Sequence, residues 1–375
     1  MNVTVQPVRT ARERKIFLTF PWRIYKNDPL WVPPLLHSRD KMTDPQRGVF
    51  FQRGEADFFI AWVNGRPVGT LCAAEDKATN AAKNRRDCVI GFLDYIPDHA
   101  VFAALIGTAR QWASARQLDT LFGPFDLDYD DAYGVLVDGR DRPPTLMCSH
   151  TPPYYHQFME AAGFQPARKD NIAFALDFND SAQLKRLARL GDWARQRGEI
   201  ILREVNFKDW DAEIDRILYL LQTSMAHIPG HIGWRRDTLE TAVKPFRDIA
   251  DPELILFAEV KGEAVGWLPG VPNLNEALIH ANGLRFPWDY ARLWWYMRQP
   301  PRGLAIKAIA VLPEYWGTAV PIYMFDELIQ RARAKGYTWG DLSITSEDNP
   351  TTPGLAKQLG ATLYKRWRVY YLPIN

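Results

Sequence analysis

The part of the sequence that most clearly indicates a binding site is a tight turn between an apolar run and a helical run. The run from Leu304 to Leu312 predicts a buried strand, and the turn from Pro313 to Gly317 leads into a helix that ends near Ala334. Backbone N–H groups at the start of a helix bind anions, because they lack partners within the helix and lie at the positive end of its dipole. The stretch therefore predicts a phosphate-binding turn.

Three side chains are candidates for proton transfer. His227 and His231 lie in a loop after a predicted helix, and a histidine that titrates near neutrality can accept a proton from an amine. Their spacing also fits a pair of metal ligands, but Pro229 and Gly230 interrupt any helix and no third ligand is apparent, so no metal is expected. Lys307, on the predicted strand, is either catalytic or an exposed side chain that extends toward solvent.

Two further groups of side chains each have a structural and a functional interpretation. Asp126, Asp128, Asp130 and Asp131 form an acidic cluster that lacks the glycine and the distal glutamate of a calcium-binding hand. The cluster is either a polar loop or a patch that attracts the ammonium group of a substrate. Tyr154 and Tyr155 lie near the last predicted helix of the first half of the chain. They either belong to a core or contact a substrate.

The composition limits the classes of partner and the location. With 375 residues the chain is long enough for two domains, and its formal net charge of +2 does not favour a nucleic-acid partner. The cysteines Cys72, Cys88 and Cys148 are widely spaced, which favours reduced thiols over a disulfide framework or a metal site. No apolar run approaches the roughly 20 residues of a membrane-spanning helix. We expect a cytoplasmic protein, with peripheral association with the inner membrane face as the alternative.

Several sequence features occur twice, at one constant offset, which shows that the chain repeats itself. An Asn-Gly turn at Gly65 and a Lys-Gly turn at Gly262 each join two strand-like runs, and Gly163 and Gly360 each follow a short helical run. Both pairs are 197 residues apart (262 − 65 and 360 − 163). Strand-like starts and ends match at the same offset: Val3–Val5 with Ile200–Leu202, and Ile172–Leu176 with Val369–Pro373. This register predicts a duplicated domain.

We therefore predict a first domain over residues 1–178, a connecting amphipathic helix over 179–198 and a second domain over 199–375. The copies differ where chemistry is expected. In the first copy, Val89 to Tyr95 runs into Ile96-Pro97-Asp98 and a helix, and Asp98 is an N-cap whose charge repels phosphate. The turn at Gly317 therefore makes the second copy the predicted catalytic one.

The turn resembles the acyl-CoA-binding motif of the GNAT superfamily of N-acyltransferases, Gln/Arg-x-x-Gly-x-Gly/Ala. Pro313-Glu314-Tyr315 and Gly317 match this pattern, whereas Trp316, Ala319 and Pro321 depart from it. The resemblance covers nearly the whole chain and implies an α/β fold of two tandem GNAT-like domains, each a mixed, mostly antiparallel sheet flanked by helices. The phrases Asp28–Pro34, Gly123–Asp126 and Thr151–Tyr155 are similar to a bacterial tandem group that includes ceramide synthases.

This resemblance implies transfer of an acyl group from acyl-CoA, or from an acyl carrier protein, to a primary amine, with a long-chain or lipid amine favoured. It assigns coenzyme contacts to the residues Ile309, Val311, Trp316, Gly317, Thr318, Ala319 and Asn349. The family's usual base and general-acid positions hold Ala305 and Ala356, so His227 and Lys307 are the catalytic candidates. Substrate contacts are assigned to Tyr154, Tyr155, Asp126 and Asp128.

Two other functions remain open at this point. The chain is alternatively a non-catalytic acyl-CoA-binding protein, since the usual polar positions are vacant, or an aminoacyl-tRNA-dependent transferase, which the near-neutral charge disfavours. An aromatic insertion, Pro269 to Arg302, is predicted to cover the core with Leu293, Trp294 and Met297. The alternatives for this insertion are a roof over an acyl-chain channel and a membrane contact.

Overall fold

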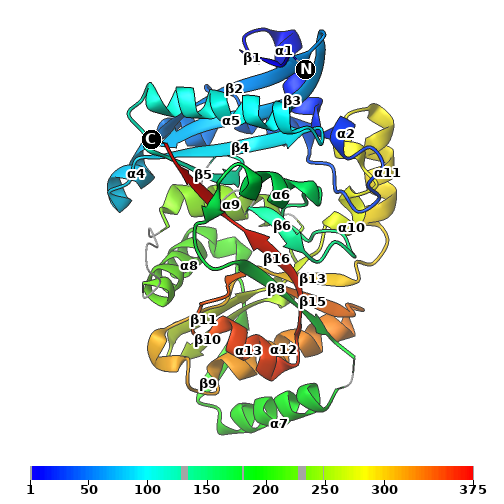
Figure 1. Ribbon diagram of the computed structural model, residues 1–375. Helices are drawn as coiled ribbons and strands as arrows, with labels where there is room; N and C mark the ends of the chain where they lie inside the picture. Colours follow the sequence, from blue (N-terminus) through cyan, green and yellow to red (C-terminus); the bar gives the residue numbers. More distant parts are fainter. Residues whose placement is uncertain (1, 128–133, 180, 227–233, 248, 375) are drawn as a thin grey trace. The chain divides into compact units, whose positions relative to one another are not determined.

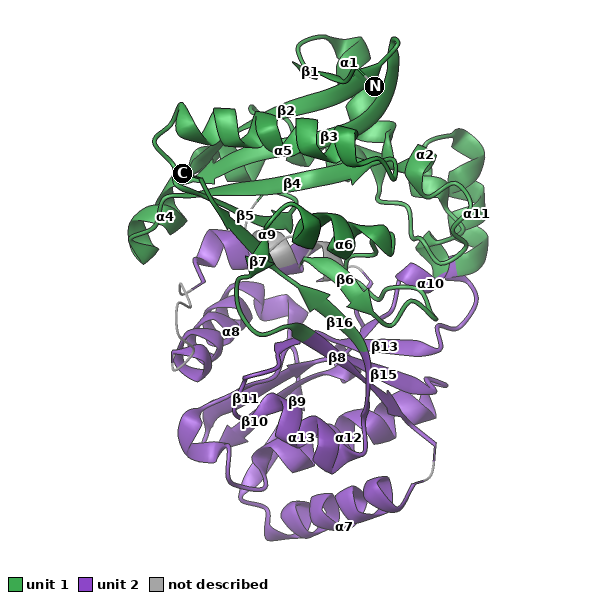
Figure 2. Ribbon diagram, in the orientation of Figure 1, with its two compact units in different colours: residues 1–171, 277–296, 365–375 green, residues 172–276, 297–364 purple. Residues whose placement is uncertain are grey.

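The computed structural model describes residues 2–127, 134–179, 181–226, 234–247 and 249–374, and these form two compact units (Figure 2). Unit 1 comprises residues 1–171, 277–296 and 365–375, and unit 2 comprises 172–276 and 297–364. The units are therefore discontinuous in sequence. The predicted copies are consecutive halves of the chain, and their boundaries stay a prediction. None of the described helices is long and apolar enough to cross a membrane.

Unit 1 is built on one sheet, in which the fifth and sixth strands are neighbours although they are far apart in the sequence (Figure 1). In spatial order the strands are β1 (Thr4–Pro7), β2 (Gly54–Val63), β3 (Arg66–Asp76), β4 (Asp87–Tyr95), β5 (Thr120–Phe125), β17 (Tyr370–Pro373) and β7 (Gln165–Pro166). Only β4 and β5 are parallel among these described neighbours. The C-terminal strand β17 thus completes the sheet of the unit that begins at the N-terminus.

Unit 1 also contains helices, of which α5 covers the sheet and buries its apolar side chains. They are α1 (Ala11–Thr19), α2 (Pro21–Ile24), α3 (Leu36–Met42), α4 (Lys77–Lys83), α5 (His99–Ser114), α6 (Tyr154–Ala161) and α11 (Pro287–Met297). Helix α5 buries Val101, Leu105 and Ala109, which repeat at helical spacing, in the same core as Leu71 and Ile90 of the sheet. A short strand, β6 (Val135–Asp138), pairs with the last residues of β16 (Thr362–Arg368).

Unit 2 contains two groups of strands. The antiparallel group has the order β14 (Ala310–Val311), β11 (Glu263–Pro269), β10 (Ile255–Val260) and β9 (Ile200–Glu204). The other group has the order β12 (Val271–Pro272), β13 (Gly303–Ile306), β15 (Trp339–Ser346) and β8 (Asn171–Asp177), followed by β16. Strands β13 and β15 are parallel. The predicted α/β class with mixed, mostly antiparallel sheets flanked by helices is confirmed.

The helices of unit 2 are α7 (Ala182–Arg197), α8 (Trp210–Met225), α9 (Arg236–Arg247), α12 (Val320–Ala334) and α13 (Thr352–Leu359), with the short α10 (Asn275–Leu278) at its boundary. The predicted amphipathic helix before the second copy is therefore present as α7. Single 3₁₀ turns are η1 (Val49–Gln52), η2 (Phe207–Asp209), η3 (Pro252–Leu254), η4 (Asn282–Leu284) and η5 (Pro313–Tyr315).

The two predicted hairpins are confirmed and share their irregularities. Asn64 and Gly65 between β2 and β3 have φ of 48° and 72°, and Lys261 and Gly262 between β10 and β11 have φ of 54° and 83°. Two consecutive residues in the left-handed region are typical of the turns that match strand twist. Each hairpin also has a bulge, at 61/62 and at 258/259, again 197 residues apart (258 − 61). The two hairpins thus have the same local structure.

The predicted single strand from Leu304 to Leu312 is wrong. The segment forms β13, which pairs with β15, and then β14, which pairs with β11. Residues 307–309 belong to neither strand, because the two ends of the segment pair with different neighbours. The break opens the side of the sheet where a site can form.

Candidate functional site

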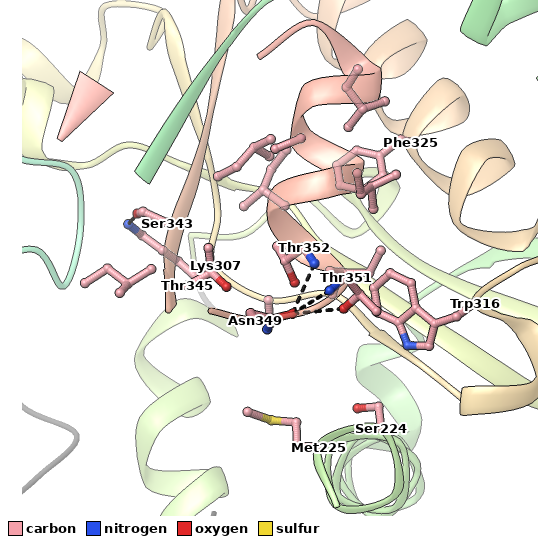
Figure 3. Close-up of a pocket in the computed structure, with 18 of the residues that line it drawn as sticks. Ser224, Met225, Lys307, Trp316, Phe325, Ser343, Thr345, Asn349, Thr351 and Thr352 are labelled. Carbon is pink, nitrogen blue, oxygen red and sulfur yellow. Dashed lines mark hydrogen bonds between the residues drawn. The ribbon is translucent and has the colours of Figure 1, made fainter. Parts of the chain in front are cut away.

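A cavity of about 150 Å³ lies in unit 2 where the segment β13–β14 parts from β15 (Figure 3). Residues 306–309 and 342–345 line it from the two strands. Helices α8, α12 and α13, the turn at Trp316 and the loop at Asn349 contribute the remaining walls. Most of its lining is apolar: Leu221, Met225, Ile306, Ala308, Ile309, Phe325, Leu342, Ile344, Leu355, Ala356 and Leu359. A largely apolar cavity with a few polar groups is typical of a small-molecule site.

The polar part of the cavity is a cluster of charged and hydroxyl groups. Lys307 Nζ donates to Asp341 Oδ2 at 2.7 Å and to Ser343 Oγ at 2.6 Å. Ser343 Oγ donates to the same carboxylate oxygen at 2.6 Å, and the hydroxyl of Tyr364 donates to Asp341 Oδ1 at 2.7 Å. Lys307 and Ser343 line the cavity, whereas Asp341 lies behind them with no exposed surface. The carboxylate therefore fixes an ammonium group and a hydroxyl group at the cavity wall.

This arrangement corrects the interpretation of Lys307 as an exposed side chain. Its side chain is mostly buried, and it forms an ion pair with a fully buried carboxylate. Burial of two charges is costly unless they are paired and hydrogen-bonded, and both conditions are met here. A cation held in this way can stabilise negative charge that develops on a bound substrate.

The predicted phosphate-binding turn follows directly from the cavity. Trp316 lines the cavity, and its Nε1 is buried with no hydrogen-bond partner among the described residues. The hydroxyl of Thr318 donates to the carbonyl of Tyr315 at 2.7 Å and accepts from the N–H of Val320, the first residue of α12, at 3.2 Å. Gly317 is exposed, and a Cβ built on it would meet nothing within 4 Å. The turn therefore leaves open space at the helix N-terminus.

Asn349 joins the cavity to helix α13. Its side-chain oxygen accepts from the N–H and hydroxyl of Thr351, both at 3.0 Å, and from the N–H of Thr352 at 3.1 Å (Figure 3). The oxygen thus satisfies N–H groups at the start of the helix, as an N-cap does. Its amide nitrogen takes no part in these bonds. Because Asn349 lines the cavity, this nitrogen is a donor available on the same side chain.

The structure brings together four of the predicted site residues, namely Lys307, Ile309, Trp316 and Asn349. Val311 of β14 is not among the lining residues, because it is fully buried and pairs with Gly266 of β11. Gly317, Thr318 and Ala319 form the adjoining turn. His227 and Asp128, and with them His231, lie outside the described residues.

The predicted substrate residues of the first copy lie in unit 1. Tyr155 is fully buried, stacks on Tyr95 with ring centroids 4.5 Å apart, and its hydroxyl accepts from the N–H of Tyr95 at 3.3 Å. Burial raises the pKa of Tyr155 well above its usual value. Tyr154, half-buried, donates to the carbonyl of Tyr95. Asp126, also half-buried, follows β5. None of these three residues lines the unit 2 cavity.

Sequence reasoning missed Asp341, Ser343 and Tyr364. A signal for the first two was present, because a carboxylate and a hydroxyl two residues apart in an apolar strand share one face. An aspartate within such a strand is unusual unless it is paired. Its partner Lys307 is 34 residues away in the sequence. That pairing depends on the parallel register of β13 and β15.

Comparisons with known proteins agree with this architecture. The chain is 28% identical to the bacterial ceramide synthase of Caulobacter vibrioides (strain NA1000 / CB15N), over 98% of this chain and 97% of that protein. It is 26% identical to protein YghO of Escherichia coli (strain K12), over 98% and 94% of the two chains. No protein-family model matches the sequence.

Solved structures share the fold at low sequence identity. A tandem GNAT protein from the clavulanic acid biosynthesis pathway superposes with a TM-score of 0.58 and 13% identity, covering 100% of this chain and 99% of that one. A probable N-acyltransferase from Enterococcus faecalis V583 superposes with a TM-score of 0.52 and 9% identity, covering 100% and 73%. The first match spans both chains almost completely, which confirms the fold implied by the sequence resemblance.

Proposed function

We propose that this chain, which has the tandem GNAT fold, transfers an acyl group from a thioester to a primary amine in the cavity of unit 2. The observation that carries the proposal is the cavity between β13–β14 and β15, with Lys307 and Ser343 fixed at its wall by a buried carboxylate. The thioester donor is acyl-CoA or an acyl carrier protein. Attack is direct, and no covalent acyl-enzyme is formed.

The donor fits the broken strand. Ile309 lies at the break and lines the cavity, and its backbone groups have no hydrogen bond to any described residue. An extended pantetheine arm carries amide groups that can pair with such a free backbone. The N-terminus of α12 then supports the phosphate end of the donor. Since Trp316 stands where a cation is usual in this motif, the indole Nε1 is the replacement donor that we assign there.

The chemistry follows from the polar cluster. The amine nitrogen attacks the thioester carbonyl carbon, so that a C–N bond forms and the C–S bond breaks with departure of the thiolate. The Lys307 ammonium stabilises the negative oxygen of the tetrahedral intermediate. Ser343 Oγ takes the proton from the attacking nitrogen as it passes its own proton to Asp341. Ser343 Oγ then gives its proton to the departing thiolate and takes one back from the Asp341 carboxyl behind it, which leaves the cluster unchanged.

A long-chain acyl group or a lipid amine suits this site. The cavity is mostly apolar, so a hydrocarbon chain gains about 0.8 kcal/mol for each buried methylene group. The 28% identical relative is named a bacterial ceramide synthase, and ceramide is an N-acylated lipid amine. Both observations support this acceptor and donor class over acetyl transfer to a small polar amine.

Calorimetry with palmitoyl-CoA, acetyl-CoA and free CoA tests the donor, and amide formation with a long-chain amine tests the reaction. We expect palmitoyl-CoA to bind more tightly than acetyl-CoA, and the amide to form. Binding without turnover for either acyl-CoA or acyl carrier protein would indicate a non-catalytic ligand-binding protein. If none of the donors binds, the proposal is wrong.

A further inference from the structure

Helix α11 exposes a continuous aromatic face. Trp288, Tyr290, Trp294 and Trp295 are between 55% and 63% exposed, although tryptophan is usually among the more buried residue types. At 100° per residue these four side chains occupy one side of the helix. The prediction that Trp294 and Met297 cover the core is therefore wrong, since both are exposed.

The opposite face of α11 is anchored by polar groups. Asp289 has no exposed surface and accepts from the N–H of Phe286 at 3.0 Å and from the amide nitrogen of Asn282 at 3.3 Å. Tyr296 stacks on His280 with centroids 3.8 Å apart. The usual amphipathic arrangement is thus inverted, because the carboxylate faces inward and the indoles face outward.

Contacts with the rest of unit 1 hold this orientation. Asn282, which donates to Asp289, accepts from Trp22 Nε1 at 2.8 Å, and the guanidinium of Arg285 lies 4.8 Å from the ring centroid of Trp22. A Cβ built on Gly283 would lie 2.4 Å from the carbonyl of Pro34, so this turn fits closely against the N-terminal segment. The exposed face is therefore presented by a fixed helix, not by a loose loop.

The charge around the aromatic face is positive. Within unit 1, residues 277–296 contain Arg285 and Arg292, and their one carboxylate, Asp289, is buried 4.0 Å from the Arg292 guanidinium. Arg292 is exposed on α11 itself. Tryptophan and tyrosine favour the head-group level of a bilayer, and arginine is attracted to anionic lipid phosphates. Both chemistries occur together on this surface.

We propose that α11 binds the surface of an anionic phospholipid bilayer. The helix lies parallel to the membrane, and its indole and phenol rings insert at the head-group level. Arg285 and Arg292 pair with lipid phosphates. The complementary charge favours an anionic lipid surface over a neutral one. The inference rests on α11 alone and does not depend on the proposed acyl transfer.

Vesicle co-sedimentation tests this proposal with the full chain. We expect binding to phosphatidylcholine vesicles that contain phosphatidylglycerol, weaker binding to pure phosphatidylcholine, and a decrease as salt is added. The double variant Trp288→Ser, Trp295→Ser should lower the partition coefficient at least about tenfold. Trp193→Ser is the matched control, because Trp193 is a comparably exposed tryptophan on α7, and it should bind like the wild type.

A second variant separates surface chemistry from folding. Arg292→Gln keeps every aromatic side chain, and we expect it to lower binding to anionic vesicles about threefold to fivefold with little effect on neutral ones. Circular dichroism must show native folding for all variants. Wild-type protein that stays in the supernatant with anionic vesicles would overturn the proposal. An equal loss of vesicle binding for Trp193→Ser would overturn it as well. So would a wild-type dimer that is absent in the double tryptophan variant but present in the other variants.

Discussion

The central strands of the two units differ in continuity. Strand β4 of unit 1 is a single strand from Asp87 to Tyr95, and all nine of its residues are buried, although its register with β3 and β5 shifts near Gly91. The equivalent segment of unit 2, by order along the chain, is interrupted between β13 and β14. The same type of hairpin precedes both segments. The difference shows that a small local loss of strand pairing, within a similar frame, creates the space for a ligand.

Side chains fill the first region and leave a cavity in the second. Beside the end of β4, Tyr95 stacks on Tyr155, and the guanidinium of Arg39 lies 4.4 Å from the ring centroid of Phe92. Burial raises the pKa of Asp94, which accepts from the Tyr155 hydroxyl. In unit 2 the ammonium group of Lys307 instead lines a cavity, held there by Asp341. A buried polar cluster is therefore a packed core in one unit and a candidate reaction centre in the other.

The helices that follow these strands begin differently. The carboxylate of Asp98 accepts from the N–H groups of Ala100 at 2.8 Å and Val101 at 3.2 Å at the start of α5, so that this helix carries its own anion. The neutral hydroxyl of Thr318 accepts from one N–H group at the start of α12. Only the second helix start is free of a negative cap, as the sequence predicted.

The largest effect is expected for Lys307→Met, which removes the cation from the cavity. Activity should fall at least about 100-fold, since oxyanion stabilisation is lost. Stability should fall by roughly 3–5 kcal/mol, because the buried carboxylate of Asp341 loses its ion pair with Lys307. Initial rates and urea unfolding measure the two effects.

The double variant Lys307→Met, Asp341→Asn separates them. The introduced asparagine is neutral, and its side-chain oxygen can still accept from the hydroxyl of Tyr364, so most of the lost stability should return while activity stays low. Recovery of activity together with stability would show that the ion pair is purely structural, like the buried cluster of unit 1.

Gly317→Glu tests the turn before α12. Because a side chain at this position meets open space, stability should change by no more than about 0.5 kcal/mol. The added carboxylate should repel the donor's phosphates and weaken acyl-CoA binding at least about tenfold. Gly317→Gln has nearly the same size without the charge and should bind more nearly like the wild type. Unchanged affinity for the Glu variant, measured by calorimetry, would place the donor elsewhere.

Asn349 offers a smaller and more specific test. Asn349→Ala should destabilise the protein by about 1 kcal/mol, because α13 loses its side-chain acceptor. Asn349→Asp keeps that acceptor and should retain stability, but it removes the amide donor and should weaken acyl-CoA binding. Thermal unfolding and calorimetry on both variants distinguish the roles. Equal donor affinity in wild type and Asp variant would assign Asn349 to capping alone.

The smallest effect is expected in unit 1. Asp98→Ala should cost about 1 kcal/mol through loss of the α5 cap. Activity per folded molecule should not change, because this helix start is not part of the cavity. A substantial fall in turnover at full folding would contradict the assignment of the chemistry to unit 2.

Much of the local structure could be predicted from the sequence because its signals are local. Adjacent turn residues with positive φ set the hairpins, and Gly163 and Gly360 set the ends of two helices with φ of 86° and 81°. The position of the Gly317 turn at the start of α12 is also as predicted. The hairpins and helix ends needed only residues that are close in the chain. The cavity-lining residues Ile309, Trp316 and Asn349 were instead expected from the family resemblance.

The break at 307–309 could not be predicted in the same way. The segment from Leu304 to Leu312 is a continuous apolar run, and nothing within it shows that β13 and β14 pair with different neighbours. Nor does a helical pattern alone tell which face meets the core. The helical spacing predicts that Leu293, Trp294 and Met297 cover the core, whereas the buried hydrogen bonds of Asp289 hold the opposite face inward and leave Trp294 and Met297 exposed.

The sequence by itself therefore determined the hairpins, the helix ends, the repeat and the turn before α12, since neighbouring backbone angles and caps decide these features. Only the tertiary structure decided that Lys307 meets Asp341 and Ser343, and that the C-terminal strand β17 completes the sheet of unit 1. Pairings between distant segments depend on strand register and on competition among strands for partners. Both are properties of the folded chain as a whole.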